Sequence, residues 1–184
     1  MARTPSNMFP LGELAPEFCL PEPLSGNDLS LSQLKGSKAT VVMFICNHCP
    51  FVKHIFAGLV ALGRDYQSEE VGIVAISSND VSNYPEDAPD NMAALAQELG
   101  FTFPYLYDQS QDVAKAYDAA CTPDFYLFDA GLRCVYRGRM DEATPGNDVP
   151  VTAKDLRAAI DATLAGKQVN ENQYPSIGCN IKWK

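Results

Sequence analysis

The sequence predicts an α/β fold, in which a mixed central sheet is flanked by helices. Two continuous apolar runs, at residues 39–45 and 71–76, are typical of strands buried on both faces. Strands and helices alternate up to about residue 120, and an adjacent pair of strands and a closing helix follow. This order places helices on both faces of one sheet.

Before the first buried strand, the chain predicts a short N-terminal extension. Pro, Gly and Asn punctuate the short apolar stretches of A-P-E-F-C-L-P-E-P-L-S-G-N-D-L-S, which indicates a hairpin, and a helical turn is expected at residues 30–35. After the strand, apolar residues recur at helical spacing from Phe51 to Tyr66. This pattern predicts a helix of about four turns that starts directly after the strand.

The segment after the second strand is acidic and rich in proline. Residues 77–91 read S-S-N-D-V-S-N-Y-P-E-D-A-P-D-N, which predicts a surface loop whose acidic side chains face solvent. The loop leads into a helix that carries Met92, Leu95 and Leu99, so the two together form an acidic loop-helix insertion. A strand at 103–107 and a short helix at 111–120 are expected next.

The last third of the chain predicts two strands and one helix. The strands, at 124–129 and 132–138, are joined by a tight turn at Ala130-Gly131. Leu156, Ile160 and Leu164 mark the helix, and Gly166 is its stop signal. Without repeats or linkers, we expect one domain over residues 1–184 with a C-terminal tail at 167–184.

Composition narrows the possible partners. The 184 residues are 46% hydrophobic and 20% charged, as in an ordinary globular protein. A net charge of −9, with no basic cluster, argues against nucleic acid and membrane surfaces as partners. The N-terminus has no apolar signal region, so we expect a cytoplasmic protein. In that reducing compartment, six cysteines indicate redox chemistry or metal binding rather than structural disulfides.

The stretch C-N-H-C-P-F, Cys46 to Phe51, is the main candidate site. It lies where a strand leads into a helix, and the unpaired N–H groups and positive end of a helix stabilise a thiolate. A protonated His48 would add to this effect. Pro50 favours the first helical position, which would make Cys49 the cap residue. On local chemistry, either sulfur could be the more activated one.

Two plainer interpretations of the motif compete with redox chemistry. Both cysteines could simply pack in the interior, because unoxidised cysteine is among the most buried residue types. A zinc site at Cys46, His48 and Cys49 lacks a second ligand pair, since Cys121 and Cys134 are isolated. We therefore expect no metal and no cofactor.

With strand, C-x-x-C and helix in this order, the chain resembles the thioredoxin superfamily. The segment C-T-P-D-F-Y-L-F-D places Thr122-Pro123 before a buried strand, which looks like the cis-proline turn of that fold. The resemblance implies that Thr122 and Pro123 dock the backbone of a substrate. It also places Cys121 near the motif as a possible further redox thiol. Cys19 and Cys134 lie in expected strands and are assigned to core packing.

More specifically, the chain resembles the peroxiredoxin-like or redoxin branch, relatives of alkyl hydroperoxide reductase and thiol-specific antioxidant proteins (AhpC/TSA). The blocks that carry this likeness are A-P-E-F-C-L, C-N-H-C-P-F-V-K-H, Y-P-E-D-A-P-D-N-M and P-S-I-G-C-N-I-K-W-K. The peroxiredoxin pattern P-x-x-x-T-x-x-C would end at Cys49. Val42 stands at its proline and Cys46 at its threonine, and no Arg stands beside strand 124–129.

The resemblance implies a thiol-disulfide oxidoreductase. Cys46 is expected to attack a protein or small-molecule disulfide, Cys49 to resolve the mixed disulfide, and His48 to tune the pair. An unidentified thiol reductant would recycle it. The alternatives are a thiol peroxidase with Cys49 as the attacking sulfur and a non-catalytic copper carrier. Cys179 could resolve an intermediate, although Ile181 and Trp183 suggest a tail held by apolar contacts. The oligomeric state stays open.

Overall fold

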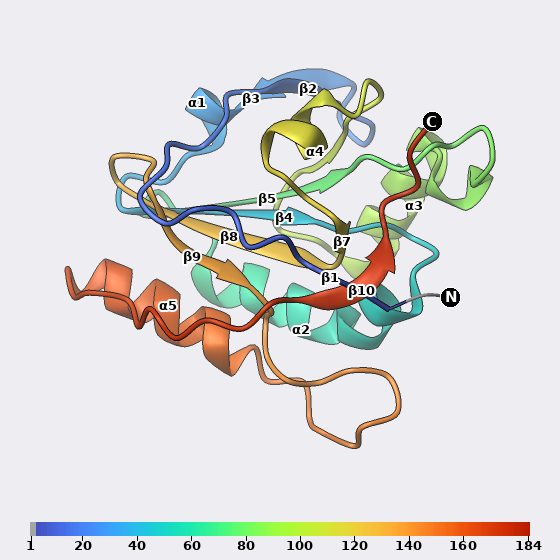
Figure 1. Ribbon diagram of the computed structural model, residues 1–184. Coiled ribbons are helices and arrows are strands. Elements are labelled where there is room, and N and C mark those ends of the chain that lie inside the picture. The colour runs from blue at the N-terminus through green and yellow to red at the C-terminus, as the bar shows by residue number, and fades with distance from the viewer. Residues whose placement is uncertain (1–2) are drawn as a thin grey trace.

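A computed structural model describes residues 3–184, and its centre is a five-stranded mixed sheet (Figure 1). The strand order is β6-β5-β4-β8-β9. The strands are β4 (Ala39–Phe44), β5 (Val71–Ser77), β6 (Tyr105–Tyr107), β8 (Asp124–Asp129) and β9 (Cys134–Gly138). β4, β5 and β6 pair in parallel, whereas β8 is antiparallel to both β4 and β9. The predicted α/β fold with a mixed central sheet is confirmed.

Alternate side chains of β4 point to opposite faces of the sheet, as the period of a strand requires. Val41 and Met43 pack into one hydrophobic cluster, and Val42 and Phe44 pack into the other. All six residues of this strand are buried, which is why the sequence shows a continuous apolar run rather than an alternating one.

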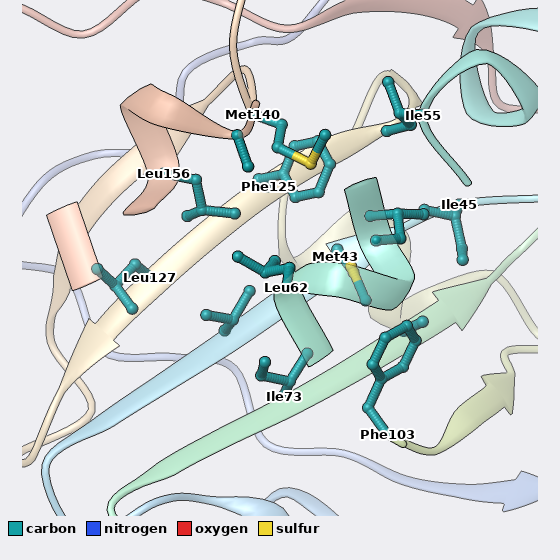
Figure 2. Close-up of a cluster of buried hydrophobic side chains, with 14 of the residues drawn as sticks. Met43, Ile45, Ile55, Leu62, Ile73, Phe103, Phe125, Leu127, Met140 and Leu156 are labelled. Atoms are coloured by element: carbon teal, nitrogen blue, oxygen red, sulfur yellow. The ribbon is translucent and has the colours of Figure 1, made fainter. Parts of the chain in front are cut away.

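Three helices cover the first face: α2 (Pro50–Tyr66), α3 (Pro89–Leu99) and α5 (Lys154–Leu164). Figure 2 shows this cluster, in which Met43 and Ile73 of the sheet lie near Leu62 of α2. The second face is covered by the N-terminal hairpin, formed by β2 (Cys19–Glu22) and β3 (Asn27–Ser30), together with α1 (Leu31–Leu34) and α4 (Asp112–Ala116). The N-terminal hairpin and the turn after it are confirmed.

The helix expected at residues 111–120 is wrong at its C-terminal end. α4 stops at Ala116, and Asp118 takes a positive φ of 50°, which ends the helical path. The residues beyond it form the two-residue strand β7 (Cys121–Thr122). This strand is part of a second sheet with the order β1-β10-β7, in which β1 and β10 are built from the two ends of the chain.

The sequence patterns predict neither β1 (Arg3–Pro5) nor β10 (Ile177–Asn180), because short strands at chain ends carry little periodicity. The tail is held to the body by backbone hydrogen bonds in addition to apolar contacts: the Ile181 N–H donates to the carbonyl of Ala120, and the Asp80 N–H donates to that of Lys182. Ile181 is buried as expected, but Trp183 is 43% exposed, so the expectation that it pins the tail is wrong.

The acidic loop contains a one-turn 3-10 helix, η1 (Pro85–Asp87), directly before α3. Its side chains are not all solvated, since Asp80 and Asp87 are buried. Among residues 3–184, no helix combines the length and the apolar character that crossing a bilayer requires.

Candidate active site

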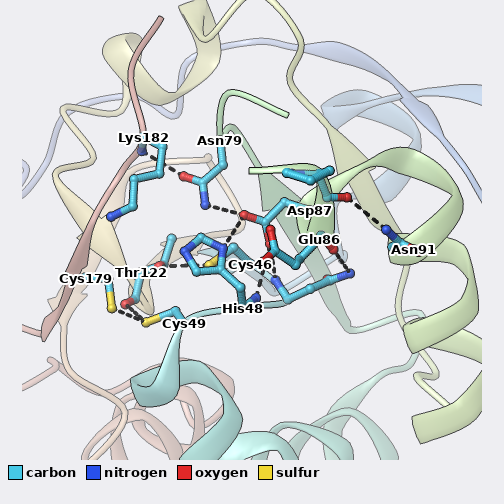
Figure 3. A network of polar contacts seen from close by, with 12 residues as sticks. Cys46, His48, Cys49, Asn79, Glu86, Asp87, Asn91, Thr122, Cys179 and Lys182 are labelled. Carbon is cyan, nitrogen blue, oxygen red and sulfur yellow. Dashed lines mark hydrogen bonds and ion pairs between the residues drawn. The ribbon is translucent and has the colours of Figure 1, made fainter. Parts of the chain in front are cut away.

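Four short segments meet at the carboxyl end of β4 and bring three sulfur atoms together (Figure 3). Cys46 follows β4, and Cys49 is the N-cap of α2 with Pro50 at the first helical position. The cap position that proline indicates for Cys49 is therefore confirmed. β7 contributes Thr122, whose peptide bond to Pro123 is cis, and β10 contributes Cys179.

Cys49 lies at the centre of this group. Its Sγ is hydrogen-bonded to that of Cys46 on one side and lies 2.8 Å from the Sγ of Cys179 on the other. It is also 3.2 Å from the Thr122 carbonyl oxygen, which accepts the S–H of the protonated thiol. The Cys46 Sγ lies 3.3 Å from the Thr122 hydroxyl. The three sulfurs thus form one contact group, which we call the sulfur triad.

The sulfur triad is closed to solvent in this conformation. Cys46 is 1% exposed, Cys49 0% and Cys179 1%, and none of them is in a disulfide. A molecule that reacts with these sulfurs can therefore reach them only when a covering segment moves.

The thiolate is favoured at Cys49. A hydrogen bond from the Cys46 thiol, aided by others from Cys179 and the Val52 N–H, lowers the pKa of Cys49 to about 5 although burial opposes the shift. The positive end of α2 acts in the same direction. The pKa of Cys46 is raised well above its ordinary value, because this thiol donates to Cys49, is buried and faces the negative charge of Asp87.

In the reduced triad, the Cys179 thiol donates a hydrogen bond to the Cys49 sulfur. Burial and its hydrogen bond to Cys49 raise the pKa of Cys179 to about 12. Cys49 therefore carries the negative charge of the reduced triad, with a protonated thiol on each side of it.

A buried carboxylate organises the loop that holds the first cysteine. Asp87 is 0% exposed and accepts hydrogen bonds from the backbone N–H groups of Asn47 and His48, at 2.8 and 3.2 Å. It also bonds the His48 Nδ1 at 2.6 Å and the Asn79 side-chain amide at 2.7 Å. These four bonds satisfy a buried charge that would otherwise be costly. Figure 3 shows how they tie the cysteine loop to the acidic segment.

His48 points toward this carboxylate rather than toward a sulfur. Its ring bonds Asp87 and stacks on Tyr84, with ring centroids 5.3 Å apart. The ring therefore contacts the carboxylate whose charge raises the pKa of Cys46, and the expected tuning role of His48 stays a prediction.

The side of Thr122 that the resemblance assigns to a substrate backbone is occupied by the protein's own tail. β10 pairs antiparallel with β7, and Cys179 is the register partner of Thr122. Gly178 permits this approach, since a Cβ at that position would collide with the carbonyl oxygen of Thr122. Pro123 itself borders a surface hollow that Phe51 and Ile177 also line.

The remaining cysteines behave differently from one another. Cys134 is buried in the second hydrophobic cluster, as expected for core packing. The assignment of Cys19 to the core is wrong, because this residue is exposed on the outward side of the N-terminal hairpin. Cys121 is buried, its Sγ lies 3.6 Å from the Pro123 carbonyl oxygen, and burial raises its pKa strongly. A thiol held protonated in this way is a poor nucleophile, and a redox role for Cys121 stays a prediction.

The structure brings together a set of metal-ligand types, Cys46, His48 and Asp87, in which Asp87 replaces the Cys49 considered from the sequence. Cys46, His48 and Asp87 each offer one ligand atom, and these atoms lie within 4.8 Å of one another. The oxygens of Asp87 already accept four hydrogen bonds, and the pKa of Cys46 is raised. A metal would have to displace these protons, and metal analysis of protein purified without chelator tests the copper-carrier alternative.

Sequence reasoning misses three residues of this site, Asn79, Tyr84 and Asp87. All three lie in a stretch whose charge and prolines indicate a solvated loop, and nothing local distinguishes Asp87 from its exposed neighbour Glu86. Its burial depends on the long-range packing of η1 against the cysteine loop.

Known proteins resemble this chain in sequence and in fold. Residues 11–136 match the model of the AhpC/TSA family. The chain belongs to the AhpC/TSA family. It is thus a redoxin of the thioredoxin superfamily, as the sequence blocks predict. A protein of Mycobacterium tuberculosis whose name assigns it provisionally to the peroxiredoxins is 27% identical over 108 residues, 59% of this chain. That match spans 63% of the relative, less than two thirds of its length.

Several solved structures share the fold over most of the chain. An uncharacterised conserved protein from Geobacillus kaustophilus is 59% identical, with a TM-score of 0.98 over 100% of this chain and 97% of that one. A hypothetical protein from Sinorhizobium meliloti is 50% identical, with a TM-score of 0.95 over 98% of each chain. At 18% identity, a Chlorobium tepidum protein provisionally described as the thiol:disulfide interchange protein DsbE has a TM-score of 0.66, over 85% of this chain and 99% of that one. This last likeness shows the thioredoxin-like fold alone.

Proposed function

We propose that the protein is a thiol-disulfide oxidoreductase whose reacting couple is Cys46 and Cys49. The observation that carries the proposal is the Cys49 sulfur at the start of α2, hydrogen-bonded to Cys46 and lying opposite the cis-proline turn. A thiolate at neutral pH with a protonated thiol beside it is the arrangement that attack and resolution require.

The pKa of Cys49 is lower than that of Cys46, which disagrees with the sequence-based assignment of Cys46 as the attacking sulfur. Cys49, with a pKa of about 5, carries the thiolate, while the carboxylate of Asp87 and burial keep Cys46 protonated. We therefore infer that the Cys49 thiolate attacks one sulfur of the substrate disulfide and expels the other as a thiolate. Cys46 then attacks the Cys49 sulfur, its proton passes to the departing thiolate, and the Cys46–Cys49 disulfide remains.

The Cys46–Cys49 disulfide must also be reduced again, and a substrate must reach Cys49. A thiol reductant supplies two electrons to the Cys46–Cys49 disulfide and restores the dithiol. A protein or small-molecule disulfide reaches Cys49 when β10 separates from β7, since Cys49 is 0% exposed in the closed form. The Thr122 backbone next to Pro123 then becomes available to dock an extended substrate, and His48 adjusts Cys46 through Asp87.

Trapping of mixed disulfides tests the couple and the order of attack. In a background that carries Cys179→Ser, which removes the thiol next to Cys49, Cys46→Ser is expected to accumulate a mixed disulfide between Cys49 and a substrate such as insulin. In the same background, Cys49→Ser is expected to trap little and to lose exchange. Cys134→Ser is the matched control, because this buried cysteine lies in the other hydrophobic cluster. Trapping on Cys46 in the Cys49→Ser variant would reverse the order. Undiminished exchange in both variants would exclude the couple.

A thiol peroxidase is the second candidate function. The low pKa of Cys49 and the family match favour it, because a thiolate attacks a hydroperoxide to give a sulfenic acid and an alcohol or water. The sequence argues against a peroxidase, because Val42 and Cys46 stand where the peroxiredoxin pattern has proline and threonine. Peroxide titration separates the candidates. Stoichiometric sulfenic acid at Cys49 at low peroxide supports a peroxidase, and slow, unselective oxidation supports the oxidoreductase.

A further inference from the structure

Strand β10 presents a cysteine to the reacting centre at the position where a substrate disulfide would lie. It pairs antiparallel with β7 at the cis-proline turn, with Cys179 opposite Thr122. The Cys179 Sγ is 2.8 Å from the Cys49 Sγ, less than an ångström longer than a covalent disulfide bond of about 2.05 Å. Figure 3 shows the two sulfurs facing one another across the gap between β10 and the start of α2.

We propose that Cys179 is a third redox thiol of this protein, which forms a disulfide with Cys49 in alternation with Cys46. The proposal rests on the proposed function, since it begins from the Cys46–Cys49 disulfide. It makes the tail strand a built-in partner of the reacting couple.

The exchange balances without an external oxidant. The Cys179 sulfur attacks the Cys49 sulfur of the Cys46–Cys49 disulfide, the bond to Cys46 breaks, and Cys46 takes the proton that Cys179 gives up. One disulfide and one thiol are present before and after, so no electrons are gained or lost. Both influences of Cys49 on Cys179, the hydrogen bond and the negative charge, disappear once Cys49 is oxidised. Deprotonation of Cys179, which this attack requires, is therefore easier in the oxidised protein than in the reduced one, while burial, the largest cause of its raised pKa, acts in both.

The tail holds Cys179 in this position by contacts on both sides of it. On one side, the Ser176 hydroxyl donates to the carbonyl of Pro123, and the Ser6 N–H donates to the carbonyl of Ser176. On the other side, the Lys182 N–H donates to the side-chain oxygen of Asn79 at 2.8 Å. Asn79 also bonds Asp87, so the tail and the cysteine loop share one hydrogen-bond network. Such anchoring favours exchange, because it keeps the two sulfurs together.

The change of disulfide partner from Cys46 to Cys179 also affects the access of a substrate to Cys49. In the reduced protein, β10 is held against β7 by noncovalent contacts, and it can open. A Cys49–Cys179 disulfide ties the strand across the Thr122 edge and returns Cys46 to a thiol. Oxidation thus closes the site to a further substrate until a reductant opens the bond.

A variant without Cys46 isolates the proposed bond. Purified Cys46→Ser is equilibrated in glutathione buffers of increasing GSSG fraction, quenched with acid, alkylated and mapped by peptide mass spectrometry. The expected product is an internal Cys49–Cys179 disulfide. In the double variant with Cys46→Ser and Cys179→Ser, only a mixed disulfide of Cys49 with glutathione is expected. Equal amounts of that adduct in both variants, with no internal disulfide, would overturn the proposal.

A second pair of variants tests the position of the strand without removing any sulfur. Gly178→Ala pushes β10 away from the Thr122 carbonyl, so in the Cys46→Ser background the internal disulfide is expected to fall by about tenfold. Gly131→Ala is the matched control, because an added Cβ there meets only the side chain of Asp129 at the hairpin turn. Equal loss in both variants would contradict the requirement for β10 docking.

The wild-type protein separates failure of this inference from failure of the proposed function. If it forms a reversible Cys46–Cys49 disulfide while no variant forms Cys49–Cys179, the oxidoreductase stands and the third thiol does not. If no reversible disulfide forms at Cys49 in the wild type, the proposed function fails as well. Cys179→Ser is expected to lower the ratio of oxidised to reduced protein at a given buffer ratio, by about twofold where the two disulfide forms are equally populated, because one of them is lost.

Discussion

Cys49 and Cys134 are both buried cysteines, yet they differ strongly in acidity. Cys49 is 0% exposed and Cys134 is 2% exposed. The pKa of Cys49 is lowered to about 5, whereas burial raises the pKa of Cys134 to about 12. Cys134 sits among apolar side chains and its Sγ lies 3.5 Å from the Tyr136 carbonyl oxygen, which cannot stabilise a thiolate.

Burial alone therefore does not decide what a cysteine can do. At Cys49, four hydrogen-bond donors and the start of a long helix outweigh desolvation. At Cys134, the positive charge of Arg137 and a backbone hydrogen bond from Tyr136 lower the pKa, but desolvation outweighs both. The difference lies in the direction of the neighbouring dipoles, which only tertiary contacts set.

The largest expected effect is on catalysis. Cys49→Ser is expected to lower the rate of disulfide exchange by about 10³-fold or more, because the attacking sulfur is lost. Cys134→Ser is expected to keep nearly the full rate. Single-turnover reduction of a small aromatic disulfide measures both. A similar loss in the two variants would mean that the contrast in acidity has no catalytic meaning.

Asp87→Asn is expected to reduce the free energy of unfolding by about 2 kcal/mol, because a buried carboxylate that accepts four hydrogen bonds loses its charge. It is also expected to lower the pKa of Cys46, since the nearby negative charge is removed. Urea unfolding and pH-dependent alkylation of Cys46 measure these changes. Glu86→Gln, at the exposed neighbour, is the control. Equal destabilisation by the two substitutions would argue against the hydrogen-bond role of Asp87.

The acidity of Cys49 also predicts a pH dependence of stability. Its folded pKa of about 5 lies below its ordinary value, so between these two pH values the unfolded chain binds more protons than the native one. The stability of the reduced protein is expected to rise with pH across this window, and to be lost as pH falls toward 5, with a contribution of up to about 1.4 kcal/mol per pH unit from this group. Urea unfolding from pH 5.5 to 8 should show a flatter slope in Cys49→Ser. Parallel slopes would disprove the lowered pKa.

The smallest expected effects concern cysteines outside the site. Cys134→Ala is expected to cost about 1 kcal/mol of stability, because it removes a buried group and leaves a small cavity. Cys19→Ala is expected to stay within about 0.5 kcal/mol of the parent, because Cys19 is exposed. Thermal unfolding of the two variants ranks them. The reverse ranking would show that the hairpin contributes more to packing than its exposure suggests.

Much of the fold follows from local patterns in the sequence. The apolar runs predict β4 and β5, and the spacing of Phe51, Ile55 and Leu59 predicts α2. Pro50 by itself identifies Cys49 as the cap of that helix, and Gly166, with a φ of 65°, ends the last helix where expected. These features are accessible because a strand, a helix and a cap each depend on residues close together in the chain.

The missed features depend on residues far apart. Whether Asp87 is buried depends on packing against Asn47 and His48, about forty positions earlier, and no local pattern records that contact. The same holds for β10, which pairs with β7 more than fifty positions away. Strands of two to four residues are too short to show a clear periodicity.

The sequence by itself determined the α/β fold, the membership of a redoxin branch and the presence of two cysteines at a strand-to-helix junction. Only the tertiary structure decided which sulfur carries the charge, where the imidazole of His48 points, and that Cys179 is the neighbour of Cys49. The reason is physical: secondary structure follows from side-chain periodicity along the chain, whereas the acidity and contacts of a thiol follow from donors and charges that folding brings from distant segments.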